Sequence, residues 1–130
     1  MPGKAKLIHT LINQHRIEKK LAPLKWSLRL ARSARAHSMN MARNIVPVGH
    51  HGFKTRSERL IKKGRYRMVG ENVAYNFGYA KPASQAFQQW LNSPGHRANL
   101  EQARYRLTGI SVVRSQRGHY YFTQLFAEPL

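Results

Sequence analysis

The sequence predicts one α+β domain over residues 1–130, with helices first and a β-hairpin last. Apolar residues recur at helical spacing through the first part of the chain, which indicates amphipathic helices. The end of the chain instead holds two β-branched and aromatic runs around a polar turn. A chain of 130 residues with 42% hydrophobic residues can bury one core. Because strands and helices do not alternate strictly, we expect them in separate layers.

The first elements are predicted to be two amphipathic helices and a loop. An apolar stripe indicates a helix over about residues 5–19, and Pro23 separates it from the next element. Ser27 can cap a second helix, which fades near Asn44. Residues 46–53 are rich in glycine and histidine, so we expect a loop there.

A short helix and a strand should follow this loop. Thr55 and Glu58 have the spacing of a capping box, which predicts a helix over about residues 56–63. Gly64 is expected to end that helix. Residues 68–75 mix apolar and β-forming residues, so we expect a strand.

The last elements are two further helical segments and the hairpin. Pro82 suits the first position of a helix. The Ser-Pro pair at 93–94 can start a helical turn, which places His96 near its N-terminus. Residues 107–113 and 119–126 are predicted to form the hairpin.

The chain is strongly basic, with 23 Lys and Arg against five Glu and a formal net charge of +18. Such a charge attracts nucleic acid, anionic lipid, lipopolysaccharide or a polyanionic wall polymer, and a well-solvated surface is the other interpretation. No apolar run approaches the roughly 20 residues of a membrane span. The segment after Met1 shows no signal peptide and enters a helical pattern. The charge alone therefore does not name the partner.

Several kinds of site are excluded by composition. The chain has no Asp and no Cys. A Ser-His-Asp triad, a cysteine nucleophile and a cysteine-ligated zinc site are therefore impossible. A glycine-rich phosphate loop and a G-x-S-x-G elbow are also absent.

Four polar residues remain as candidates for a site. His50, His51 and His96 lie in predicted loops or at a helix start, beside glycines, where sites commonly form. Glu71 is flanked by glycine and apolar residues, so its carboxylate needs partners. Two imidazoles and a carboxylate can hold zinc with an open water position, or can form a hydrogen-bonded network without metal. The spacing does not decide between these two.

The other histidines and the aromatic residues are expected to have ordinary roles. We expect His9 and His15 to be structural or surface residues and His37 to be a hydrogen-bonded core residue. His119 is placed at the hairpin turn and expected to be exposed. Tyr66, Tyr75, Tyr79 and Tyr105 lie among basic residues, and we interpret them as core residues or as the wall of a cleft.

Eight segments in order resemble the CAP superfamily, which includes cysteine-rich secretory, antigen 5 and pathogenesis-related proteins. They are LINQHR at 11–16, PLKW at 23–26, AHSMNMA at 36–42, GHHGFKTR at 49–56, GENVA at 70–74, WLNSPGHRAN at 90–99, LTGI at 107–110 and YYFTQLF at 120–126. The chain is most similar to short, cysteine-free bacterial SCP-like extracellular proteins. Each motif alone is weak, but the ordered set covers nearly the whole chain.

The resemblance implies an α-β-α sandwich with a small antiparallel sheet between helical layers. It also implies a central cleft in which two histidines and acidic residues can bind zinc or another divalent cation. The matching positions are His50, Glu71 and His96, with His50 and His96 as metal ligands. Glu71 would be the catalytic residue if there is one. His51 takes the place that bacterial members usually give to Asp.

The chain also departs from the family pattern. Eukaryotic members often carry a second Glu three residues after the tryptophan of the fourth helix, and Ser93 stands there after Trp90. One acidic ligand or supporting partner is thereby lost. Asn72 is expected to bond backbone near the cleft. Arg97 either anchors its loop or faces the cleft.

Three functions are compatible with these residues. The first is a monomeric, secreted or envelope-associated domain whose central His/Glu cleft binds a divalent metal and a small extracellular ligand, such as a lipid, a peptide or a wall component, without catalysis. The second is a metal-assisted, peptidase-like hydrolase that uses His50, Glu71 and His96. The third is a basic module that binds anionic polymers or envelope surfaces. Fold alone does not choose among them.

Overall fold

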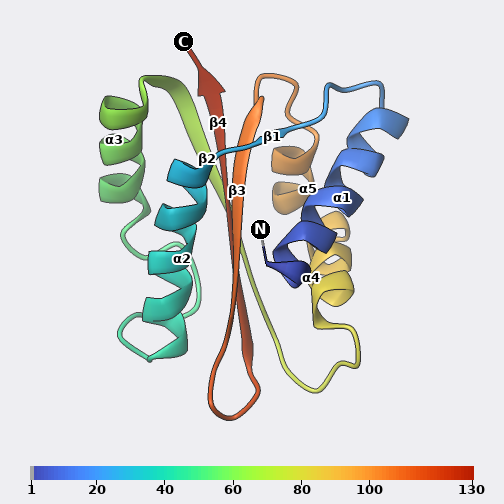
Figure 1. The fold of residues 1–130 in the computed structure, drawn as a ribbon, viewed down its shortest axis with the longest axis vertical. Coiled ribbons are helices and arrows are strands. Elements are labelled where there is room, and N and C mark those ends of the chain that lie inside the picture. The colour runs from blue at the N-terminus through green and yellow to red at the C-terminus, as the bar shows by residue number, and fades with distance from the viewer. Residues whose placement is uncertain (1) are drawn as a thin grey trace.

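The computed structural model describes residues 2–130, which form five helices and a four-stranded sheet. In chain order the elements are α1 (Gly3–Glu18), β1 (Lys25–Trp26), α2 (Leu28–Ala42), α3 (Phe53–Gly64), β2 (Tyr66–Asn76), α4 (Pro82–Leu91), α5 (Pro94–Leu100), β3 (Leu107–Arg114) and β4 (Tyr120–Pro129). Figure 1 shows the sheet edge-on, with α2 and α3 on one side and α1, α4 and α5 on the other. The α+β class and the α-β-α sandwich are therefore confirmed.

The sheet has the strand order β1-β3-β4-β2. The predicted hairpin is present as the antiparallel pair β3–β4, and β2 pairs antiparallel with β4. The short β1 runs parallel to β3, so the sheet is mixed rather than wholly antiparallel. A strand of only two residues has no readable periodicity, which is why the sequence did not predict it.

Two apolar layers form because β4 is buried on both faces. Phe122 and Phe126 pack toward α1, α4 and α5, where Trp90 is fully buried. Leu125 and Ala127 alternate with them and pack toward α2 and α3. The Trp90 indole also donates a hydrogen bond to the carbonyl of Val73, which attaches α4 to β2. This attachment positions the middle of β2, where Glu71 lies.

The two predicted caps differ in outcome. Ser27 caps α2 as expected, because its hydroxyl accepts a hydrogen bond from the Leu30 amide at 3.2 Å. The capping box predicted at Thr55 is wrong, because α3 already begins at Phe53 and Thr55 lies inside it. Gly52 precedes the helix with φ of 77°, a left-handed conformation that glycine adopts without strain. Gly52 therefore occupies the N-cap position of α3, and no side chain caps the helix.

Gly109 allows α2 to approach β3 closely. A Cβ atom at this position would lie 2.1 Å from the Ala31 amide nitrogen and 2.5 Å from the Leu30 carbonyl carbon. We expect Gly109→Ala to lower the free energy of unfolding by about 2–3 kcal/mol, since backbone atoms must shift to admit the methyl group. Urea unfolding measures this change. Gly95→Ala is the control, because a Cβ there meets nothing within 4 Å; equal stability of the two variants would refute the prediction.

Candidate functional site

His50, Glu71 and His96, which we call the His–Glu cluster, come from three different elements. His50 lies in the loop between α2 and α3, Glu71 lies in the middle of β2, and His96 lies in α5. The Nδ1 atom of His50 donates to Oε1 of Glu71 at 3.0 Å. Glu71 is buried, with 1% of its side chain exposed, whereas 52% of the His50 side chain is exposed. The structure thus places a buried carboxylate beneath an accessible imidazole.

Arg56 neutralises the buried carboxylate of Glu71. Its Nε atom donates to Oε2 at 2.8 Å, and its Nη2 atom donates to Oε1 at 2.9 Å. The same guanidinium also donates from Nη1 to the backbone carbonyl of His51 at 3.2 Å. Paired donors of this kind match the two oxygens of a carboxylate. Sequence reasoning missed Arg56, because nothing in a helical arginine shows that it reaches a strand 15 residues later.

His37 fixes the loop that carries His50. Its Nε2 atom lies 2.6 Å from the carbonyl oxygen of Gly49, and since a carbonyl only accepts, Nε2 carries the proton. The side chain is buried, which agrees with the expected hydrogen-bonded core histidine. His37 therefore acts on the cluster indirectly, by holding the residue before His50.

A chain of amides attaches α5 to β2 beside the cluster. Asn72 donates to the carbonyl of His96 at 3.1 Å. Asn99 donates to Oδ1 of Asn72 at 2.9 Å and to the carbonyl of Glu71 at 3.2 Å. Ser93 precedes α5 at the cap position, but its hydroxyl is paired with Nδ1 of His96 at 2.8 Å. Ser93 thus orients the His96 ring instead of capping the helix.

Arg97 and His51 do not contact Glu71 with their side chains. Arg97 donates from Nε to Glu101 at 3.0 Å, and Glu101 also lies 2.6 Å from Nε2 of His15. The His15 hydrogen bond, and then that of Arg97, hold the pKa of Glu101 below its usual value. Arg97 thus bonds to the C-terminal end of its own helix, at a glutamate that also contacts α1 through His15. His51 is exposed and contributes its backbone carbonyl to Arg56.

The donor set falls short of a three-ligand zinc site. Within residues 2–130, no group of three His, Cys, Asp or Glu side chains is arranged to hold a metal ion. Glu71 is committed to Arg56 and His50, so it supports the His50 ring rather than offering free ligand positions. His96 lies near His50, whose positive charge adds to the effect of burial in lowering the pKa of His96. The residues therefore fit at most a pair of imidazole ligands.

Acidification is expected to destabilise the fold through His37 and His96. Burial is the main cause that lowers the pKa of both rings below the ordinary value of 6.5. Below that value the unfolded chain takes up protons that the folded chain resists, so the free energy of unfolding should fall as pH drops from 7 toward 5. Urea unfolding across this range measures the slope. His37→Gln should flatten it and the exposed control His51→Gln should not; identical slopes in all three proteins would contradict the assignment.

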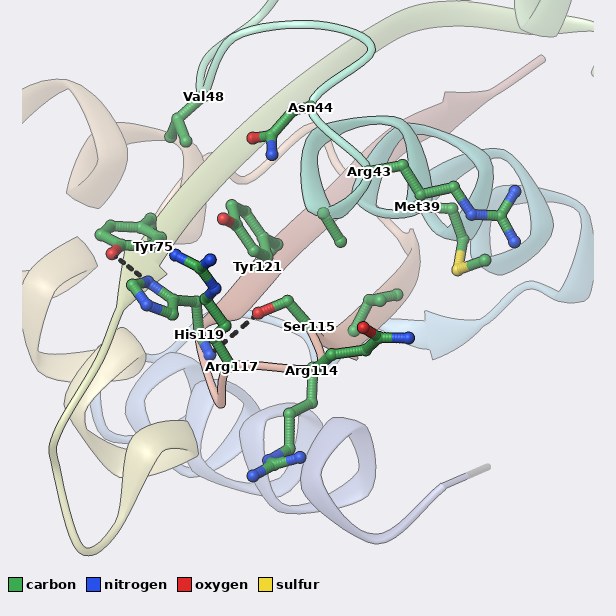
Figure 2. Close-up of a pocket in the computed structure, with 13 residues that line it drawn as sticks. Met39, Arg43, Asn44, Val48, Tyr75, Arg114, Ser115, Arg117, His119 and Tyr121 are labelled. Atoms are coloured by element: carbon green, nitrogen blue, oxygen red, sulfur yellow. Dashed lines mark hydrogen bonds between the residues drawn. The ribbon is translucent and has the colours of Figure 1, made fainter.

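A second feature is an open hollow of about 900 Å³ at the turn end of the β3–β4 hairpin, which we call the hairpin hollow. Figure 2 shows its aromatic and basic lining, which consists of Tyr75, His119 and Tyr121 with Arg43, Arg114 and Arg117. Val48, from the loop that carries His50, also lines it. The hollow thus shares that loop and β2, which carries both Glu71 and Tyr75, with the His–Glu cluster, although His50, Glu71 and His96 do not line it.

The expectation that His119 is exposed is wrong. Its ring is half-buried and lies against Tyr75 and Phe77, with centroid separations of 5.6 Å and 4.2 Å. The Tyr75 hydroxyl is hydrogen-bonded to Nδ1 of His119. His119 was predicted to be exposed because it lies at the hairpin turn. In the structure, the end of β2 brings Tyr75 and Phe77 against the His119 ring. Tyr75 was expected either in the core or in the wall of a cleft, and it lines the hairpin hollow.

None of the helices formed by residues 2–130 is long and apolar enough to cross a membrane. The chain is 36% identical over 124 residues to "Uncharacterized membrane protein YlbC" of Bacillus subtilis (strain 168), covering 93% of this chain and 33% of that protein. The chain therefore spans about a third of the length of this curated relative.

Two solved structures share the fold. An extracellular protein containing a SCP domain from Bacillus anthracis str. Ames has a TM-score of 0.80 and 28% identity, covering 97% of this chain and 40% of that one. An outer surface protein of Borrelia burgdorferi has a TM-score of 0.81 and 19% identity, covering 98% and 93%. The model of the CAP family, described as the cysteine-rich secretory protein family, matches residues 9–126. Although it contains no cysteine, this chain belongs to the CAP family.

Proposed function

We propose that this chain is an extracellular or envelope-associated domain that binds a small anionic ligand without transforming it. The binding surface would combine the His–Glu cluster with the hairpin hollow. The observation that carries the proposal is the state of Glu71, whose buried carboxylate already accepts hydrogen bonds from Arg56 and His50. A general base must instead reach a substrate proton or a water molecule.

Two related proteins support an extracellular or envelope location. The Bacillus anthracis structure is that of an extracellular protein, and the Bacillus subtilis relative is named a membrane protein. A small monomeric domain displayed at or beyond the membrane would meet lipids, peptides and wall fragments. The basic surface would favour those that carry negative charge, because the chain has a formal net charge of +18.

The lining of the hairpin hollow indicates which kind of ligand would bind. Tyr75 is the exposed member of an aromatic group with His119 and Tyr121, and it offers a surface against which a ring or an apolar group can pack. Arg43, which directly follows α2, Arg114 at the end of β3 and Arg117 in the hairpin turn supply positive charge to the lining, as Figure 2 shows. The lining is thus suited to a molecule that joins an apolar or cyclic part to a carboxylate or a phosphate.

Binding can be measured calorimetrically with three probes: a soluble muropeptide, lysophosphatidylglycerol and tetra-alanine. We expect an anionic probe to bind, to be recovered unchanged by mass spectrometry, and to lose affinity at least tenfold in Tyr75→Ala. Tyr79→Ala is the matched control, because Tyr79 is also exposed but does not line the hollow. Failure of all three probes to bind, or an equal loss in both variants, would refute the proposal.

The metal-assisted hydrolase remains the second candidate, and the donor set disfavours it. With His50 and His96 as the two imidazole ligands of the His–Glu cluster, zinc binding should be weak, since catalytic zinc sites use three protein ligands. Calorimetry with zinc tests this expectation. Tight zinc binding that His96→Ala abolishes, together with cleavage of the tetra-alanine probe, would favour the hydrolase over the binding domain.

A further inference from the structure

A groove of about 500 Å³ lies between α2 and α3, on the helical face away from α1, α4 and α5. We call it the α2–α3 groove. Its walls are one stripe of each helix. On α2 the lining residues run from Arg29 to Asn40, and on α3 they run from Thr55 to Lys63, both at helical spacing. The groove therefore forms a track along the two helices.

Four cations line this track without acidic partners. Arg29 and Arg32 come from α2, and Arg59 and Lys63 come from α3. All four are exposed, and none forms an ion pair with an acidic residue of the described chain, residues 2–130. No Glu lines the groove. Facing cations in a recess focus a positive potential and attract an anion more strongly than cations scattered over a convex surface.

The number and the donor types of the cations fit a chain of phosphates. Arg29 and Arg32 are three positions apart on α2, and Arg59 and Lys63 are four positions apart on α3, which corresponds to about 5–6 Å along each helix. Guanidinium groups bind phosphate oxygens with paired donors, and a lysine adds a point charge. Ser33 and Thr55 also line the groove and contribute hydroxyl groups. Two pairs of cations can contact several phosphates at once, which a linear polyanion supplies and a single small anion does not.

The remaining lining decides which linear polyanion fits. No Phe, Tyr or Trp lines the groove. Proteins that bind single-stranded nucleic acid combine a basic track with aromatic rings on which the bases stack. Ala36 and Leu60 are the apolar side chains of the lining, and carbon atoms of the longer side chains add to its apolar surface. The lining thus favours phosphates that carry no bases.

We propose that the α2–α3 groove binds a linear phosphate polymer without bases, either an inorganic polyphosphate or a polyol phosphate. The groove shares no lining residue with the hairpin hollow and does not include His50, although His37 and Arg56, which support the His–Glu cluster, line it. The two proposals can fail independently. Arg56 also lines the groove, but its guanidinium is committed to Glu71, so it is left unchanged in the test.

The test measures affinity for polyphosphate and for poly(glycerol phosphate) by fluorescence anisotropy over a salt series. The variant Arg29→Gln/Arg32→Gln/Arg59→Gln/Lys63→Gln removes the four groove cations. We expect it to bind at least about tenfold more weakly at physiological salt. The slope of log affinity against log salt should also fall by about 3, at roughly 0.7 for each lost phosphate contact. Relative affinity for the two polymers identifies which source the groove prefers.

The control variant Lys6→Gln/Lys19→Gln/Lys81→Gln/Arg106→Gln removes the same amount of charge from exposed positions outside the groove. It should keep affinity within about threefold of the unchanged chain. Equal weakening in both variants would overturn the proposal, because binding would then follow overall charge. Tighter binding of oligo(dT), or of phosphatidylglycerol vesicles, at the same phosphate concentration would also overturn it, in favour of nucleic acid or a membrane surface.

Discussion

Arg56→Met is expected to lower the free energy of unfolding by about 3–5 kcal/mol, because it leaves the buried Glu71 carboxylate with too few partners. Only 1% of the Glu71 side chain and 14% of the Arg56 side chain are exposed, so solvent cannot replace the lost guanidinium. The effect should also reach the loop before α3, since Arg56 holds the carbonyl of His51. Urea unfolding monitored by tryptophan fluorescence measures the change.

Two further variants separate this ion pair from a general effect of charge. Arg56→Lys keeps the charge but loses the paired donors, so its stability should lie between those of the unchanged chain and Arg56→Met. Arg59→Met removes an exposed arginine that has no ion-pair partner within residues 2–130, and should change stability by less than about 0.5 kcal/mol. If Arg56→Met were as stable as Arg59→Met, Glu71 would not depend on Arg56.

Arg16→Met is the second large effect, with an expected loss of about 3 kcal/mol or more. Arg16 is fully buried and donates to four backbone carbonyls. The acceptors are Ala22, Leu100, Gln102 and Tyr105. Its guanidinium thus joins the end of α1 to the loop between α5 and β3. Methionine fills similar space but leaves these carbonyls without their donor, and each buried orphan costs about 1–3 kcal/mol, not fully additively.

Thermal unfolding followed by circular dichroism tests this prediction. Arg16→Lys supplies one ammonium in place of the planar guanidinium, so it should recover only part of the stability. Arg106→Met is the matched control, because Arg106 lies in the same loop region but is exposed. A loss in Arg16→Met no larger than that in Arg106→Met would show that the four carbonyls find other donors.

Periodicity and turn residues were sufficient to predict most of the fold. The apolar stripes of α1, α2 and α4 are local, and so are the β-branched runs of β3 and β4. The start of α3 was predicted three residues late, because a capping-box pattern at Thr55 competed with the left-handed Gly52. Whether a glycine adopts positive φ depends on the backbone around it, which a local pattern does not reveal.

The site was predictable only as a set of candidates. The sequence pointed to His50 and Glu71 through their neighbours, and the structure brings them into contact. It did not point to Arg56 or His37, because their partners, Glu71 and Gly49, are reached through tertiary packing. Arg56 decides whether the carboxylate is free or neutralised, whereas His37 holds the loop that carries His50. Arg56 therefore decides between a catalytic and a binding interpretation of the same motif.

The central claim is that Glu71 is neutralised by Arg56 and serves to hold the cluster together. A double-mutant cycle with Arg56→Met, Glu71→Gln and the combined variant measures it most directly, by urea unfolding at neutral pH. We predict a coupling energy of about 2 kcal/mol or more, so that Glu71→Gln restores much of the stability that Arg56→Met removes. Additive losses, with coupling within about 0.5 kcal/mol of zero, would contradict the claim and leave Glu71 free for catalysis.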